Sequence, residues 1–165
     1  LLLEINMLPV ELLKYVIRPV LAEFGRVNPK TNSKTIEALL LGTAMVESRV
    51  LRITQMGGGP AQSYFQIEPF TARDIINRTP TAYQDVFDLF AMDYATQLDQ
   101  ITANQHLACC VARMKYWLDK KPVPTGATGL AEYHKRVYNT PLGKANVEDN
   151  IDDFMLAMSM VEKTR

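Results

Sequence analysis

Glu47 is the residue whose type and position point most directly to catalysis. At about 100° per residue, helical spacing puts Glu47 on the apolar stripe of a helix predicted over residues 33–48. The other members of this stripe are Ile36, Leu40 and Thr43. The carbonyl end of a helix and burial both favour the protonated form of a carboxylic acid. A protonated acid beside a cleft can transfer its proton to a glycosidic oxygen, which is general-acid cleavage.

A structural role for Glu47 is the alternative interpretation. Arg49 and Arg52 follow closely in the sequence, and either could hold the carboxylate in an ion pair. Structural ion pairs also perturb buried acids, so position alone does not separate the two interpretations.

The segment after Glu47 interrupts the helical pattern. Residues 49–69 contain three consecutive glycines at 57–59 and a mixture of polar and aromatic residues. A long irregular segment beside an acid is typical of a functional loop. Glycines have no side chains with which to contact a sugar. We therefore expect them to form a turn with positive φ that lets Tyr64 and Gln66 face the cleft.

Two sequence blocks resemble the lysozyme-like lytic transglycosylases, which share a superfamily with the goose-type lysozymes. The first block, "AMVESRVLRITQMGGGPAQSYFQIEPFTARDI", resembles a Glu-Ser at a helix end, a loop and a "G-A-x-G-L-x-Q-I-x-P-x-T-A" segment. The second, "VYNTPLGKA" at 137–145, resembles the family's "A-Y-N-A-G-x-G-x-V" element. Gln66 follows Glu47 by 19 residues, about the spacing in that family. The triple-glycine form is most similar to phage-encoded members.

The resemblance implies a mainly α, lysozyme-like single domain over residues 1–165, with a central buried helix that carries the catalytic Glu. It implies cleavage of the β-1,4 bond between N-acetylmuramic acid and N-acetylglucosamine in peptidoglycan, by lytic transglycosylation with 1,6-anhydro ends. That reaction needs no metal and no cofactor. Two alternatives stay open: a muramidase that hydrolyses the same bond, and a non-catalytic virion or cell-wall-binding module with the same fold.

The same resemblance assigns roles to individual residues. Glu47 would be the sole catalytic acid and base, and Ser48 an orienting hydroxyl. Gln66 would contact the substrate, and Tyr138 and Asn139 would form the wall that faces Glu47. Tyr138 could instead be an aromatic anchor of the core, and Gln66 a polar link that fixes the loop.

The sequence departs from the family pattern at two places. Ser63 stands where the family has Gly, and Thr140 with Pro141 stands where it has Ala-Gly. Most glycosidases use two carboxylates. Glu68 and Glu132 are the candidates for a second carboxylate that would act as a hydrolytic base.

The elements that must position these residues are helices, because helical periodicity extends over most of the chain and no alternating run predicts a strand. We expect helices over residues 9–24, 33–48, 83–101, 105–119, 130–137 and 147–163, and a short one ending at Arg78. Pro19 should kink or break the first helix, which should end before Gly25. Ser33 is a good N-cap, and Thr71 with Asp74 resembles a capping box.

Composition excludes several classes of protein. The 165 residues are 47% hydrophobic, enough for one core, and the longest apolar runs are far shorter than the roughly 20 residues of a membrane span. We therefore expect no membrane insertion. Lys and Arg number 18, as do Asp and Glu, which argues against a general nucleic-acid binder. Residues 113–144 nevertheless hold seven bases against two acids, either as solvated helix faces or as a basic rim that favours an anionic polymer.

Cysteine and histidine spacing argues against disulfides and metal ligation. Cys109 and Cys110 are adjacent in a predicted helix, where a mutual disulfide would be strained. His106 and His134 have no His or Cys at ligand spacing.

The start of the chain shows no secretory signal, because no basic leader or cleavage site accompanies its apolar run. It also lacks an initiator Met, so we expect a trimmed chain or one domain of a longer one. By resemblance, we expect it in a phage particle or delivered to the periplasm or cell wall.

Overall fold

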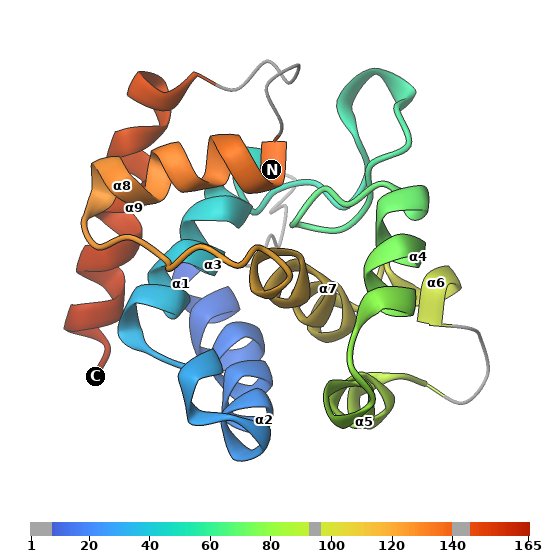
Figure 1. The fold of residues 1–165 in the computed structure, drawn as a ribbon. Helices are drawn as coiled ribbons and strands as arrows, with labels where there is room; N and C mark the ends of the chain where they lie inside the picture. Colours follow the sequence, from blue (N-terminus) through green and yellow to red (C-terminus); the bar gives the residue numbers. More distant parts are fainter. Residues whose placement is uncertain (1–7, 93–96, 140–145) are drawn as a thin grey trace.

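The computed structural model describes residues 8–92, 97–139 and 146–165, and these ranges form a mainly helical domain (Figure 1). They contain no strand, and their apolar side chains form one hydrophobic core. The prediction of a mainly α single domain is confirmed at this level. None of the helices in the described ranges combines the length and the apolar character that a bilayer crossing requires.

The helices follow one another with short connections, except for the long loop between α3 and α4. The α-helices are α1 (Pro9–Leu12), α2 (Arg18–Val27), α3 (Lys34–Ser48), α4 (Pro69–Arg78), α5 (Thr81–Phe90), α6 (Gln97–Gln100), α7 (Gln105–Trp117), α8 (Ala127–Tyr133) and α9 (Val147–Lys163). Two π-helical segments are η1 (Leu13–Ile17) and η4 (His134–Asn139), and two 3-10 turns are η2 (Pro29–Thr31) and η3 (Met56–Gly58).

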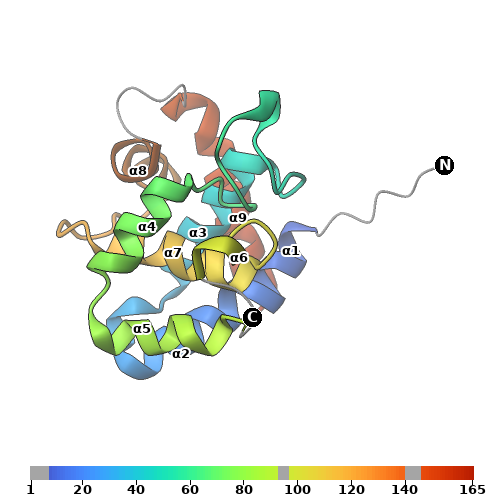
Figure 2. The same cartoon turned by 90° about the vertical axis from the view of Figure 1, so that its right-hand side faces the viewer.

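Helices α3 and α7 supply the centre of the core. Almost every residue of α3 from Ile36 to Met45 is buried, as its apolar sequence predicts. Ser33 caps the helix as expected, because its hydroxyl accepts a hydrogen bond from the Ile36 amide at 3.1 Å. Helix α9 packs along α3 and α8, while α4 and α5 lie against α7 (Figures 1 and 2). Arg49, at φ 57°, ends α3 in the left-handed conformation.

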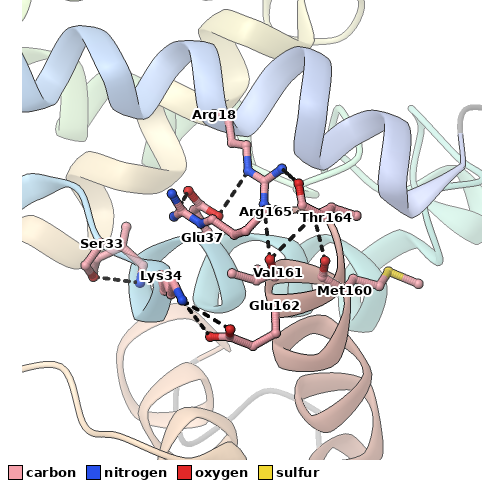
Figure 3. Close-up of polar contacts among 10 residues, drawn as sticks. Arg18, Ser33, Lys34, Glu37, Met160, Val161, Glu162, Thr164 and Arg165 are labelled. Atoms are coloured by element: carbon pink, nitrogen blue, oxygen red, sulfur yellow. Dashed lines mark hydrogen bonds and ion pairs between the residues drawn. The ribbon is translucent and has the colours of Figure 1, made fainter.

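An ion-pair cluster around the buried Glu37 joins α2, α3 and the end of α9 (Figure 3). The Glu37 side chain is only 4% exposed and accepts hydrogen bonds from Arg18 at 3.2 Å and Arg165 at 2.6 Å. Arg18 also donates to the carbonyl groups of Val161, in the last turn of α9, and of Thr164, which follows that helix. Each buried oxygen of Glu37 therefore has a cationic partner, which is the condition under which burial of a charge is tolerated.

Pro19 does not break the first helix, and the predicted end before Gly25 is wrong. The chain stays helical from α1 through η1 to Val27. The π turn places the hydrogen bond of the Arg18 amide on the carbonyl of Leu13, one residue farther back than in an α-helix. Pro19 has no N–H to donate to the Tyr15 carbonyl, and the His106 ring bonds that carbonyl at 2.8 Å instead.

The single helix predicted over residues 83–101 is wrong, because α5 ends at Phe90 and α6 begins later. Side chains from the following segment bind the backbone at the break. Gln100 pairs with both the N–H and the C=O of Met92, at 2.7 and 2.8 Å. Asn104 donates to the carbonyl of Phe90 at 2.8 Å. These side-chain bonds replace the helical ones and stop the helix.

Two helix starts also differ from expectation. The capping box proposed for Thr71 and Asp74 is wrong, because α4 begins earlier, with Pro69 at its first position, and Asp74 instead pairs with Arg78 at 3.1 Å. The helix expected at residues 130–137 begins three residues earlier, as α8, and η4 extends it. Tyr94, which falls within the helix predicted over residues 83–101, lies outside the described residues.

Three buried tyrosines should give the fold an alkaline limit. Burial raises the pKa of Tyr116 and Tyr138 well above the usual range, and raises that of Tyr133 to about 12. The unfolded chain loses these protons near pH 10, before the folded chain does. The free energy of unfolding should therefore fall as the pH rises above about 10. Ultraviolet titration should show delayed ionisation of these tyrosines in the native protein. The prediction would be contradicted if all seven tyrosines ionised in the native protein with the same pH dependence as in the denatured chain.

Candidate functional site

A cavity of about 620 Å³ opens at the C-terminal end of α3. Its walls come from the last turn of α3, the loop between α3 and α4, helix α7 and the end of η4. Four of the six residues that the sequence predicts for the site line this cavity, namely Glu47, Gln66, Tyr138 and Asn139. The chain therefore brings together residues that lie up to 92 positions apart in the sequence.

Glu47 is half-buried at the rim of the cavity, with 16% of its side chain exposed. Its Oε1 lies 2.9 Å from Nε2 of His134, which is its one hydrogen-bond partner among the described residues. The ion pair weighed from the sequence is not formed, because Arg49 pairs with Asp153 at 2.6 Å and Arg52 lies beyond ion-pair distance of Glu47. The partner of the Glu47 carboxyl group is thus a histidine, and not either of the arginines that the alternative interpretation named.

His134 is fully buried beneath Glu47. Its ring stacks on Tyr138, with centroids 5.6 Å apart, and packs against Phe154. Nδ1 is buried without a hydrogen-bond partner in the described ranges. A buried N–H without an acceptor costs more than an unpaired acceptor, so the proton belongs on Nε2. We infer that the ring donates Nε2–H to Glu47 Oε1.

The π-helical geometry of η4 explains why sequence reasoning missed His134. In the sequence, His134 has no His or Cys companion at metal-ligand spacing. It precedes Tyr138 by four residues, and one wide turn of η4 places both rings on the same side. That spacing from a residue already assigned to the site is the signal that could have identified it.

Lys115 is a second site residue that the sequence did not single out. It lines the cavity from α7, donates to the carbonyl of Tyr138 at 2.7 Å and lies 4.2 Å from the centre of the Tyr138 ring. Burial lowers the pKa of Lys115, and the negative charges of Glu47 and Glu68 act in the opposite direction. A cation here can attract an anionic part of a ligand.

Backbone strain is concentrated beside this cavity. Among the residues that the structure describes, four non-glycine residues have left-handed backbones, all in the loop between α3 and α4: Arg49 at φ 57°, Val50 at 56°, Ser63 at 69° and Gln66 at 48°. Each such residue costs about 1–3 kcal/mol, and strained residues of this kind cluster at functional sites. A β-branched residue such as Val50 is the most unusual of them.

Ser48 and Tyr64 hold the loop and are not part of the cavity lining. The buried Ser48 hydroxyl lies 2.6 Å from the carbonyl oxygen of Tyr64 and accepts a hydrogen bond from the Val50 amide at 3.1 Å. The Tyr64 amide donates to the Gln105 side chain at 3.0 Å. Ser48 therefore orients the loop backbone.

Tyr138 and Gln66 have anchoring contacts as well as a place in the cavity. The Tyr138 hydroxyl donates to the carbonyl of Phe65 at 2.7 Å, and its ring also stacks on Tyr116. The Gln66 side chain donates to the carbonyl of Ser63 at 2.8 Å. These bonds are the structural roles that the sequence left open, and they fix the wall around Glu47.

The two candidate second acids are placed differently. Glu68 is exposed and lines the cavity, whereas Glu132 is exposed on α8 and does not line it. Within the described ranges, no three His, Cys, Asp or Glu side chains converge in a way that would hold a metal ion. Thr140 and Pro141, where the sequence departs from the family pattern, lie outside the described residues.

The glycine turn has the backbone expected of it. Gly57 and Gly58 have φ values of 76° and 78°. Gln55 and Met56, just before them, line the cavity, and the Gln55 side chain accepts a hydrogen bond from the Ala61 amide at 3.0 Å. The turn thus lies between Met56 and Ala61, which both line the cavity.

Gly58→Val should reduce activity far more than it reduces the helical circular dichroism signal. In the described part of the chain, no heavy atom beyond its neighbours lies within 4 Å of the position of an added Cβ. The substitution therefore costs about 1–3 kcal/mol of backbone strain, because valine disfavours the positive φ. The loop can relieve this strain by a rearrangement that changes the cavity wall. Gly58→Asn is the matched control, because Asn tolerates this conformation. Equal losses of activity and helical signal in the Val variant would mean that the turn is structural.

Comparison with protein-family models, curated proteins and solved structures gave no match to this chain. The family resemblance therefore rests on the two sequence blocks, and the site must be argued from its own geometry. That geometry is a half-buried carboxyl group, held on one oxygen, at the rim of a cavity of ligand size.

Proposed function

We propose that the chain is a glycosidase that cleaves the MurNAc–GlcNAc bond of peptidoglycan, by lytic transglycosylation. The observation that carries this proposal is Glu47, whose Oε1 is held by His134 while its carboxyl group borders a cavity of about 620 Å³. Cavities of this volume accommodate sugar-sized ligands. The identity of the cleaved bond and of the polymer substrate is what the resemblance of the two sequence blocks implies.

The proposed reaction uses one carboxyl group twice. Because Oε1 accepts a hydrogen bond from His134, Oε2 carries the transferable proton. Glu47 gives this proton to the bridging oxygen as the glycosidic bond breaks. The resulting carboxylate then takes the proton of the muramoyl 6-hydroxyl, whose oxygen bonds to the anomeric carbon and closes the 1,6-anhydro ring. Glu47 is protonated again at the end.

Ser63 adds support from the loop. It stands at the position where the resembled family has Gly, and its φ of 69° is in the region that favours glycine. The loop thus keeps the backbone that a glycine would adopt, even though the residue differs.

Hydrolysis is the second candidate, and Glu68 is the observation that favours it. Glu68 shares the cavity with Glu47, so a second carboxylate is available to activate water or to act as a nucleophile. An internal hydroxyl held beside the anomeric carbon still has an effective-concentration advantage over water.

Product analysis tests the proposal and separates the two reactions. Purified peptidoglycan should be cleared in a zymogram, and mass spectrometry should find muropeptides one water lighter than those of a lysozyme digest. Fragments that accept borohydride reduction would establish hydrolysis, and Glu68→Gln would then be the variant to test. If neither intact walls nor isolated glycan strands are cleaved between pH 4 and 8, the enzyme proposal fails. The non-catalytic wall-binding module is then favoured.

The proposal also defines partners and a place of action. The partner is the glycan strand of peptidoglycan, and neither nucleic acid nor a membrane is involved. Delivery to the wall or periplasm as part of a phage particle or a longer chain fits the resemblance to phage-encoded members.

A further inference from the structure

A second cavity, of about 790 Å³, lies on another face of α7 and has no lining residue in common with the Glu47 cavity. Lys115 faces the Glu47 cavity, whereas Arg113 and Trp117, four residues apart, line the second one. Its remaining walls come from η2, the start of α3 and the connection between α7 and α8. Nothing in the proposed cleavage reaction uses this cavity.

Arg113 is a buried cation without a counter-ion. It is 2% exposed, and its Nε donates to the carbonyl of Thr31 at 2.9 Å. Its Nη1 is buried without a partner, and none of the described carboxylates pairs with it. Burial lowers the pKa of Arg113 to about 10, so the group is still charged at neutral pH. A charge in this state is costly unless an anion reaches it.

The rim of the cavity is also positive. Lys30, Lys120 and Lys121 line it and are exposed. Asp119 is the one acid of the lining, and it is engaged by Arg136 through two hydrogen bonds of 3.0 Å each. The lysines therefore retain their positive field, which favours an anionic ligand.

The wall beside Arg113 is aromatic. Trp117 lies under the guanidinium, with 5.6 Å from the Arg113 Cζ to the ring centroid, and Tyr116 and Tyr133 complete the wall. Aromatic faces of this kind hold flat or apolar parts of a ligand. We propose that this cavity is a binding site for an organic oxyanion, a phosphate or carboxylate group attached to a ring-sized body. The anionic group binds at Arg113 and the lysines, and the body rests on the aromatic wall.

Trp117 makes the proposal directly measurable, because it is the single tryptophan of the chain. Its fluorescence is titrated with phosphate and acetate, with phenyl phosphate and benzoate, and with sodium chloride at equal ionic strength. We expect saturable changes for the anions, with a Kd at least about threefold lower for the ring-bearing probes. Phenyl phosphate and benzoate together show whether phosphate or carboxylate is preferred.

The Lys120→Gln/Lys121→Gln double variant should raise the Kd of the ring-bearing probes at least about fivefold, because both positive charges lie at the rim. The matched control is Lys14→Gln/Lys163→Gln, which removes the same charge from exposed positions outside the cavity lining and should leave the Kd unchanged. Arg113→Met should abolish saturation, with folding checked by circular dichroism. If that variant does not fold, the lysine variants decide.

Two results would overturn the site. One is a change in Trp117 fluorescence that depends only on ionic strength for every probe and never saturates. The other is a saturable response that the lysine double variant leaves intact. Neither depends on glycosidase activity, so failure of the oxyanion site and failure of the proposed function are distinguishable.

Discussion

Glu47→Gln should lower peptidoglycan cleavage by at least about 10²-fold, the lower end for loss of a general acid. The amide preserves the size of the side chain and can still accept the hydrogen bond from His134, but it has no proton to transfer. The melting temperature should stay level or rise, because an ionisable group at a half-buried position is removed. Lysis rates and thermal unfolding of the purified variant measure the two effects.

Glu37→Gln is the matched control on the same helix. Glu37 is held by two arginines and does not line the Glu47 cavity. Its substitution should lower the melting temperature, because two guanidinium groups lose their counter-charge, while the folded protein keeps its activity. A folded Glu47→Gln variant with near-native lysis would remove Glu47 from the mechanism.

The long helices were predictable because local sequence decides them. Ser33 caps α3 as predicted, and the final helix has the predicted bounds, 147–163. The break after Phe90 was not predictable, because it depends on Gln100 and Asn104 bonding backbone groups 8 to 14 residues away. The π turns were likewise missed, since hydrophobic periodicity does not separate 3.6 residues per turn from a slightly wider turn.

The grouping of four candidate residues around one cavity was predictable where residue type or a sequence block singled them out. A carboxylic acid on an apolar stripe identified Glu47, and the two sequence blocks identified the neighbouring wall residues Gln66, Tyr138 and Asn139, which line the same cavity. Lys115 belongs to the helix predicted over residues 105–119, and nothing in the sequence singled it out as a site residue. Its place in the cavity depends on how α7 packs against η4, and a sequence pattern does not contain that packing.

His134→Phe should lower kcat by about tenfold to a hundredfold with little change in KM. The phenyl ring preserves the packing on Tyr138 and Phe154 but donates no hydrogen bond to Glu47. When Glu47 gives up its proton it becomes a carboxylate, and a hydrogen bond to a charged group contributes about 1.5–3 kcal/mol. Before the transfer, the same bond occupies Oε1 and leaves the proton on Oε2. Lysis kinetics on soluble glycan fragments measure the two constants.

His134→Gln should restore much of that loss, because the Gln side-chain amide can place an N–H near the position of the histidine Nε2. His106→Gln is the control, since His106 bonds the Tyr15 carbonyl and lies outside the Glu47 cavity. The chain has two histidines, so nitrogen-15 spectra of their rings should resolve the buried one and show its proton on Nε2. A proton on Nδ1 would make Glu47 the donor of the pair and would point its proton at the imidazole. In that case Oε1, not Oε2, would hold the acid proton. Proton donation from Glu47 Oε2 to the glycosidic oxygen, as proposed, would then be refuted.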